Sequence, residues 1–182
     1  AVLAQCPGQA PCAAGATIPG LADAASGMWV EASFSGIRNV PIAHLLEQEF
    51  GLPAAIENDA RACALAERMF GAGKDVDDFF YVTVSNGIGG ALFLNGALYT
   101  GALGNAAALR TFELEGRLLG TALAQAVNLL NPARVILGGG VSLAYDLFGP
   151  KLEQTLGWNI YRKASGNVDV MPTPLGLSLI HI

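Results

Sequence analysis

The segment from Glu57 to Tyr99 constrains the fold most, because its helix, strand and turn signals follow one another in a fixed order. It reads E-N-D-A, a helical stretch, an apolar strand, S-N-G-I-G-G, a second strand and N-G. Asn and Asp favour the start of a helix, and Asn-Gly between two apolar runs is the strongest short signal for a hairpin. The order predicts an α/β chain in which a carboxylate and a glycine-rich turn occupy neighbouring elements. Phosphoryl transfer to a hydroxyl uses such a pair.

A helix that begins at Asn58 or Asp59 carries the candidate catalytic carboxylate. The partial positive charge of a helix N-terminus favours the ionised form of Asp59, and an ionised aspartate accepts the proton of an attacking hydroxyl. An ordinary helix cap accounts for the same residue, since Asn and Asp are preferred there. The apolar residues at helical spacing are expected to form the buried face of this helix: Ala62, Leu65, Ala66 and Met69.

Two glycine-rich turns are candidate sites for an anion or a nucleotide. The first, residues 85–90, joins two strands and contains Gly87, Gly89 and Gly90. Glycines let backbone N–H groups approach an anion closely, although a simple hairpin loop has the same composition. The second follows the apolar strand 134–137 and consists of Gly138, Gly139 and Gly140. It would let an adenosine lie flat on the backbone, or it serves close packing of a helix on a strand.

Composition excludes several other classes of protein. A chain of 182 residues suits one domain or two small lobes with a real core. The net charge is −5, and the 10 Lys and Arg residues form no basic stripe, so direct nucleic-acid binding is not expected. The apolar runs fall short of the roughly 18 residues of a membrane span.

The cysteines and the N-terminus indicate the compartment. Three cysteines without a C-x-x-C spacing indicate neither a disulfide framework nor a zinc ribbon, so we expect a reducing, cytoplasmic location. The N-terminus lacks the basic region of a signal peptide. The chain starts at Ala1 rather than Met, as a fragment or a processed chain does.

Taken together, these motifs resemble the ROK family of sugar kinases and sugar-responsive repressors. The similar blocks stand in the family's order and cover most of residues 15–142. They are G-A-T-I-P-G-L-A-D (15–23), V-P-I-A-H-L-L (40–46), F-G-L-P-A-A-I-E-N-D-A-R-A-C-A-L-A-E (50–67), F-G-A-G (70–73), V-T-V-S-N-G-I-G-G-A-L-F-L-N-G-A-L-Y-T-G-A-L-G-N-A-A (82–107) and V-N-L-L-N-P-A-R-V-I-L-G-G-G-V-S (127–142).

The resemblance implies an actin-like, ribonuclease H-like ATPase fold, ATP with Mg²⁺ as cofactor and a sugar as substrate or effector. It aligns Asp59 with the catalytic base and Asn58 with a ligand of the sugar hydroxyls. It also aligns two sets of glycines with nucleotide-binding loops: Gly87, Gly89 and Gly90 with the second phosphate loop, and Gly138, Gly139 and Gly140 with the adenosine loop. A homo-oligomer is compatible with this resemblance.

The sequence also departs from the family pattern. No counterpart of the first phosphate loop, an Asp-x-Gly-Gly-Thr hairpin, is present. The family sequence G-x-A-G-E-x-G-H is replaced at residues 104–111, where Ala108 stands in place of the sugar-binding Glu and the zinc-binding His is gone. The cysteine-rich zinc segment is missing as well, so no zinc is expected. Asn86 replaces the usual Thr of the phosphate loop, and residues 177–182 do not resemble the family's closing helix.

These observations predict an incomplete fold in two parts. Residues 1–73 are the expected remnant of the N-terminal lobe, ending in the Asn-Asp helix, and residues 74–182 an abridged C-terminal ribonuclease H-like lobe. The expected function is that of a fragment of a sugar kinase, and the fragment is expected to be inactive. The parent enzyme would phosphorylate a hexose or amino sugar with ATP. The alternative is a non-catalytic, sugar-sensing domain of a transcriptional regulator, and a third reading is a truncated chain without activity.

Overall fold

A computed structural model describes residues 10–32, 35–84, 88–101, 116–161 and 168–176. The largest sheet in this part of the chain has five strands in the order β10-β9-β6-β7-β8. These strands are β6 (Phe79–Val84), β7 (Ile88–Leu94), β8 (Ala97–Tyr99), β9 (Arg134–Gly138) and β10 (Asp169–Pro172). β6, β9 and β10 run parallel, whereas β7 and β8 are antiparallel to their neighbours. The carboxyl ends of β6 and β9 therefore meet at one edge of the sheet.

The hairpin between β7 and β8 confirms the turn predicted at Asn95-Gly96. Both residues have positive φ, 52° and 75°, as the two central residues of a type I′ turn require. Leu94 pairs with Ala97 directly across this turn. The local sequence is sufficient to define this part of the sheet.

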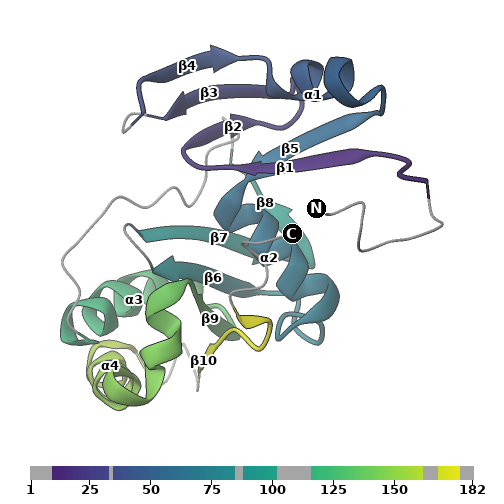
Figure 1. The fold of residues 1–182 in the computed structure, drawn as a ribbon. Helices are drawn as coiled ribbons and strands as arrows, with labels where there is room; N and C mark the ends of the chain where they lie inside the picture. The colour runs from purple at the N-terminus through teal and green to yellow at the C-terminus, as the bar shows by residue number, and fades with distance from the viewer. Residues whose placement is uncertain (1–9, 33–34, 85–87, 102–115, 162–167, 177–182) are drawn as a thin grey trace.

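Two smaller sheets lie above the five-stranded sheet in Figure 1. β1 (Ala14–Ile18) pairs in parallel with β5 (Ala54–Asn58). β2 (Leu21–Asp23), β3 (Met28–Ala32) and β4 (Ile37–Val40) form an antiparallel sheet that the sequence did not predict. α1 (Ile42–Phe50) packs on β1 and β5 around a small core that includes Ile18 and Ile56.

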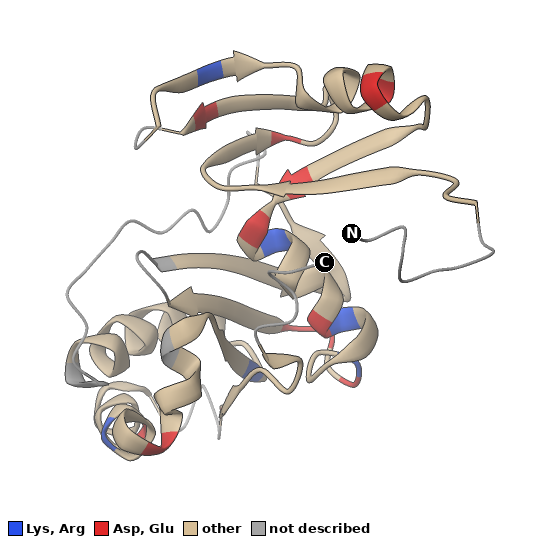
Figure 2. Ribbon diagram, in the orientation of Figure 1, with Lys and Arg blue, Asp and Glu red and all other residues tan. Residues whose placement is uncertain are grey.

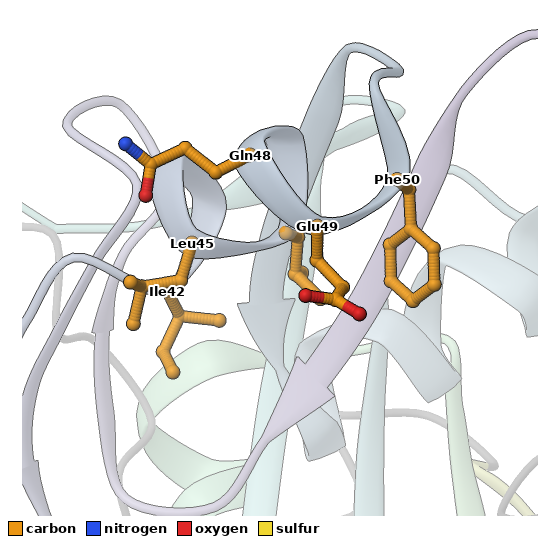
Figure 3. Close-up of a pocket in the computed structure, with 6 residues that line it drawn as sticks. Ile42, Leu45, Gln48, Glu49 and Phe50 are labelled. Atoms are coloured by element: carbon orange, nitrogen blue, oxygen red, sulfur yellow. The ribbon is translucent and has the colours of Figure 1, made fainter.

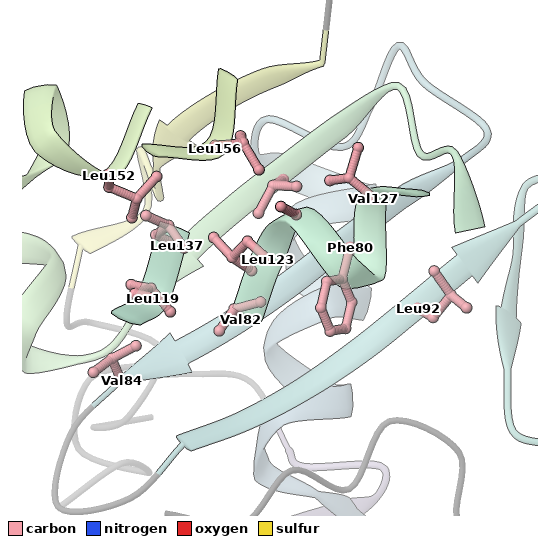
Figure 4. Packing of buried hydrophobic residues seen from close by; sticks show 12 residues of the cluster. Phe80, Val82, Val84, Leu92, Leu119, Leu123, Val127, Leu137, Leu152 and Leu156 are labelled. Atoms are coloured by element: carbon pink, nitrogen blue, oxygen red, sulfur yellow. The ribbon is translucent and has the colours of Figure 1, made fainter. Parts of the chain in front are cut away.

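Helices cover both faces of the five-stranded sheet. α3 (Gly116–Leu130) and α4 (Tyr145–Asn159) pack against one another and cover one face, while α2 (Asp59–Phe70) covers the other. The core under α3 and α4 joins side chains of β6 and β9, such as Phe80 and Leu137, to Leu123, Val127 and Leu156 of the helices (Figure 4). Alternate residues of β6 point to the two faces. Phe79 consequently lies under α2, stacked on Phe93 with ring centroids 4.7 Å apart.

The pair Gly149-Pro150 in the sequence predicts an interrupted helix, and this prediction is wrong, because α4 continues through Pro150. A proline inside a helix removes one backbone hydrogen bond. Leu152 and Leu156 of the same helix are buried in the core, and this packing holds the helix together beyond the proline.

The buried face of α2 differs from the predicted one. Leu65 is 37% exposed and Met69 is 62% exposed. The buried residues of the helix are Ala60, Arg61, Ala64 and Glu67. Small alanines let the helix lie close to β6 and β7, and the buried charged residues have polar partners, as buried charges require. Helical periodicity alone cannot show which face meets the sheet.

Two of the four charged residues of α2 follow the helix dipole, Asp59 in the first turn and Arg68 in the last, since acidic residues at the N-terminus and basic ones at the C-terminus are stabilising. Arg61 and Glu67 do not follow it, and both are buried. Acidic and basic positions therefore lie side by side near both ends of this helix (Figure 2). None of the helices in the described ranges is both long enough and apolar enough to cross a membrane.

Candidate functional site

Thr83 lies where the two glycine-rich segments meet. At the carboxyl end of β6 it is in register with Gly89 of β7 on one side and with Gly138 of β9 on the other. Its methyl group would be 3.0 Å from a Cβ placed on Gly89, and its hydroxyl oxygen 2.7 Å from a Cβ placed on Gly139. Segments about 50 residues apart in the sequence therefore flank a single side chain.

The first turn of α2 lies against the same strand ends. A Cβ on Gly89 would be 3.3 Å from the Cβ of Ala60, and Ala60 directly follows Asp59. The structure therefore brings the candidate base close to one candidate phosphate-loop glycine. Gly90 is buried and pairs with Val82, and Gly87 lies outside the described residues.

The three glycines after β9 have different surroundings. A Cβ on Gly138 would overlap the hydroxyl of Tyr81. Gly139 has a φ of 82° and approaches the carbonyl oxygen of Val84 closely, so both its conformation and its packing favour glycine. Gly140 is exposed, and among the described residues other than its chain neighbours no atom lies within 4 Å of a Cβ built there. Local packing accounts for Gly138 and Gly139, whereas the space beside Gly140 is open to a ligand.

Asn58, rather than Asp59, caps α2. Its Oδ1 accepts a hydrogen bond from the N–H of Arg61 at 3.3 Å, and its Nδ2 donates to the carbonyl of Gly20 at 2.9 Å. The side chain thereby ties the end of β5 to the turn between β1 and β2. A primary amide has two N–H donors and two acceptor lone pairs, and the contacts with described residues use half of this capacity.

The Asp59 carboxylate is exposed and close to its own helix terminus. One oxygen, Oδ1, accepts a hydrogen bond from the N–H of Ala60 at 2.8 Å. The exposed backbone donors of the first turn stabilise a negative charge at this position. An exposed, ionised carboxylate beside a glycine-rich turn can accept a proton from a bound hydroxyl.

Glu57 and Arg61 form an ion pair beneath this turn, which the sequence analysis missed. Glu57 Oε1 lies 3.5 Å from Arg61 Nη1, and the two side chains are 20% and 7% exposed. The same oxygen accepts the N–H of Asn58 at 2.8 Å. The spacing of opposite charges by four residues in E-N-D-A-R is a signal that could have found the pair.

A second polar group lies between α2 and the sheet. The Tyr81 hydroxyl has hydrogen-bonding interactions with Cys63 and Thr83, and burial raises its pKa. Burial likewise raises the pKa of the Cys63 thiol, and the negative charges of Asp59 and Glu67 add to the effect. One turn further along α2, the fully buried Glu67 accepts hydrogen bonds from the N–H of Ala72 and the hydroxyl of Thr173. These contacts tie α2 to β6 and to Thr173, which directly follows β10.

A hollow of about 440 Å³ lies elsewhere, on α1 (Figure 3). Its lining comes from this helix only: Ile42, Leu45, Leu46, Gln48, Glu49 and Phe50. It contains none of the residues that meet at Thr83. In the described ranges, no group of three or more His, Cys, Asp or Glu side chains could hold a metal ion. That no zinc binds stays a prediction, which metal analysis of the purified protein would test.

Comparison with known families gives two overlapping matches. The model of the ROK family matches residues 3–109 and residues 105–177. The matches meet at residues 105–109, within the stretch 104–111 that departs from the family sequence G-x-A-G-E-x-G-H.

Individual relatives include both kinases and repressors. A beta-glucoside kinase of Listeria innocua is 52% identical over 63 residues, which cover 35% of this chain and 21% of the kinase. A putative xylose repressor of Caldicellulosiruptor sp. is 38% identical over 90 residues, covering 50% of this chain and 23% of the repressor. The glucokinase of Thermotoga maritima is 28% identical over 216 residues, covering 79% of this chain and 68% of the enzyme. This last alignment is longer than the chain of 182 residues, so the glucokinase has internal residues without a counterpart here.

Solved structures of the same family share the fold. A ROK family transcriptional regulator, described as a homologue of the E. coli MLC protein, superposes with a TM-score of 0.79 at 20% identity, over 89% of this chain and 58% of the regulator. A glucokinase of Streptomyces griseus in complex with glucose and AMPPNP gives a TM-score of 0.67 at 22% identity, over 78% of this chain and 70% of the enzyme. The predicted actin-like ATPase fold is therefore confirmed. With the family model matching most of its length, this chain belongs to the ROK family.

Proposed function

We propose that this chain carries the catalytic base and the nucleotide-binding turns of an ATP-dependent sugar kinase that acts on a hexose or an amino sugar. Asp59 is the general base, and Asn58 binds a hydroxyl of the sugar. The phosphate and adenosine groups of the nucleotide are bound by two sets of glycines: Gly87, Gly89 and Gly90, and Gly138, Gly139 and Gly140. In this proposal the two lobes divide between residues 73 and 74.

The observation that carries the proposal is the contact of Gly89 with Ala60. It places the start of α2, and with it Asp59, against the glycine-rich connection of β6 and β7. Parallel α/β sheets bind ligands outside the carboxyl ends of their strands. Here the carboxyl ends of β6 and β9 meet beside Thr83, so the proposed ligands would lie at the usual edge of such a sheet.

The residues present fit a nucleotide at this edge. Gly140 is exposed with free space around it, as a backbone segment that receives a flat adenosine needs to be. ATP with Mg²⁺, when bound, supplies the phosphoryl group and neutralises part of its charge. Asp59 then has one task, to accept the proton of the sugar hydroxyl. The AMPPNP bound to the similar glucokinase supports the choice of nucleotide.

A regulatory, sugar-sensing domain is the second candidate function. Ala108 stands where the family has a sugar-binding Glu, and loss of this carboxylate removes positioning of the sugar. The similarity to a xylose repressor and to the MLC homologue supports this candidate as directly as the kinase matches support the first. For both candidates we propose a cytoplasmic location, a sugar ligand and no direct nucleic-acid binding by this segment; self-association would be tested by sedimentation.

Nucleotide binding tests the proposal directly. Gly140→Leu adds bulk where the structure has open space, so the melting temperature should change little. If adenosine lies on this turn, the affinity for a fluorescent ADP analogue with Mg²⁺ should fall at least about tenfold, or about 1.4 kcal/mol. Gly15→Leu is the matched control, because a Cβ at this exposed position of β1 also meets no neighbour. Absence of nucleotide binding by the unsubstituted chain, or equal binding by Gly140→Leu, would refute the proposal.

A further inference from the structure

We propose that Glu57 and Arg61 form a positioning pair, which holds the turn of Asn58 and Asp59 in place and so determines where the Asp59 carboxylate points. The catalytic meaning of this inference rests on the proposed function, in which Asp59 is the base. The structural part, that the pair sets the conformation of the turn, does not depend on it.

Glu57 Oε1 connects both sides of the turn. It lies 3.5 Å from the guanidinium of Arg61, on the first turn of α2, and accepts the N–H of Asn58 at the end of β5. A backbone N–H at a strand end needs a partner when it is shielded from water, and here the preceding side chain supplies it. One carboxylate oxygen thus joins the strand end to the helix start.

The Asn58 side chain also joins the end of β5 to the first turn of α2. Its Oδ1 accepts the N–H of Arg61, and its Nδ2 donates to the Gly20 carbonyl. Arg61 therefore contacts the turn twice, through its backbone N–H and through its guanidinium. Asp59 is the one residue of the turn whose side chain is exposed, and its direction follows from neighbours that are held on both sides.

The burial of the pair argues for positioning rather than for stability. Relative to apolar side chains, a buried ion pair adds little net stability, because both ions are removed from water. Glu57 carries the geometry of the pair, because the oxygen that meets Arg61 also accepts the N–H of Asn58. Hydrogen bonds to an ionised acceptor are stronger than those to a neutral one, so loss of the Glu57 charge should weaken both contacts and loosen the end of β5 from the first turn of α2.

Nuclear magnetic resonance of the isotope-labelled chain tests this inference without any ligand. Glu57→Gln keeps the size of the side chain and an acceptor for the Asn58 N–H but removes the charge. The side-chain amide signals of Asn58 should move away from their native positions, and exchange of the Arg61 N–H should accelerate at least about tenfold, the factor that corresponds to 1.4 kcal/mol. Asp77→Asn is the matched control, because it removes an exposed ion pair with Arg68 on the same helix. In this control the Asn58 amide signals and the exchange of the Arg61 N–H should both stay native.

The outcomes separate this inference from the proposed function. Native Asn58 signals and native Arg61 exchange in folded Glu57→Gln would overturn the positioning pair. If that variant does not fold, Arg61→Lys takes its place, since lysine keeps the charge but not the planar fork; displaced Asn58 signals would support the pair and native ones would overturn it. A glucose titration of the unsubstituted chain forms the second arm. Unchanged Asn58 and Asp59 signals at millimolar glucose would count against the proposed sugar site, whatever the ligand-free result.

Discussion

The hydroxyl group of Tyr81 fills the space that a Cβ of Gly138 would occupy. Tyr81 is buried in the centre of the five-stranded sheet, under α2, and cannot move aside freely. The glycine at the start of the proposed adenosine turn is thereby explained by packing across two strands.

Gly138→Ala should therefore destabilise the chain through overpacking, by about 1–3 kcal/mol. Tyr81→Phe removes the nearest conflicting atom, although the ring carbon Cζ would still lie 2.5 Å from the new Cβ. The double variant should therefore lose less stability than the sum of the losses in the two single variants. Urea unfolding of the two single variants and the double variant measures this coupling. Simple additivity would mean that the Tyr81 hydroxyl does not set the requirement for glycine.

Asn58 and Asp59 should respond differently to substitution. Asn58→Ala removes the cap of α2 and the bond to Gly20, and a lost cap alone costs about 1 kcal/mol. Asp59→Asn keeps a polar side chain at an exposed position and should change stability by about 0.5 kcal/mol or less. Thermal unfolding of the two variants compares them. A larger loss of stability for Asp59→Asn than for Asn58→Ala would show that Asp59 is the structural residue of this turn.

The hydroxyl of Thr173 should stabilise the buried carboxylate of Glu67. Thr173→Val keeps the shape of the side chain but removes the hydroxyl, which donates to Glu67 and also accepts the N–H of Leu175. When a buried acceptor loses its donor, the free energy of unfolding falls by about 1–3 kcal/mol, and by more for a charged acceptor. Thr17→Val is the matched control, because Thr17 is exposed on β1. Chemical denaturation should show a clear loss only for Thr173→Val; equal stabilities would mean that Glu67 needs no such donor.

Cys63 should react more slowly with iodoacetamide than Cys12. Burial raises the pKa of the Cys63 thiol, and Asp59 and Glu67 oppose its ionisation further. The thiolate is the reactive form, so at any given pH a smaller fraction of Cys63 is reactive and a higher pH should accelerate its labelling. Cys12 is exposed. Peptide mapping by mass spectrometry distinguishes the two sites, and faster labelling of Cys63 would contradict the burial of its thiol.

The chain as given should show no sugar kinase turnover. By the resemblance to the family, Ala108 stands where a sugar-binding Glu is expected, and positioning of reactants and stabilisation of charge are each worth several kcal/mol in such reactions. A coupled assay for release of ADP in the presence of glucose or mannose provides the measurement. Turnover at the roughly 1–100 per second of ordinary kinases would contradict the prediction and support the kinase over the sugar-sensing domain.

The sequence by itself determined the elements whose signals are local. Apolar and β-branched residues predicted the strand that became β6, Asn95-Gly96 predicted the hairpin of β7 and β8, and the Asn-Asp pair predicted where α2 begins. Each signal acts between residues a few positions apart, through turn conformation, capping or alternation. The order of these motifs also identified the family, which the family model confirmed.

Only the tertiary structure decided which surfaces meet. The apolar spacing of α2 suggested that Leu65 and Met69 are buried, yet the sheet receives Ala60, Ala64 and two charged residues instead. A helix carries several stripes of residues, and the partner surface selects among them according to size and hydrogen bonding. For the same reason the sequence could not assign the cap to Asn58, whose side chain also donates to Gly20 in the turn between β1 and β2, or place the Tyr81 hydroxyl against Gly138. Such contacts join residues 38 or more positions apart, and local patterns carry no information about them.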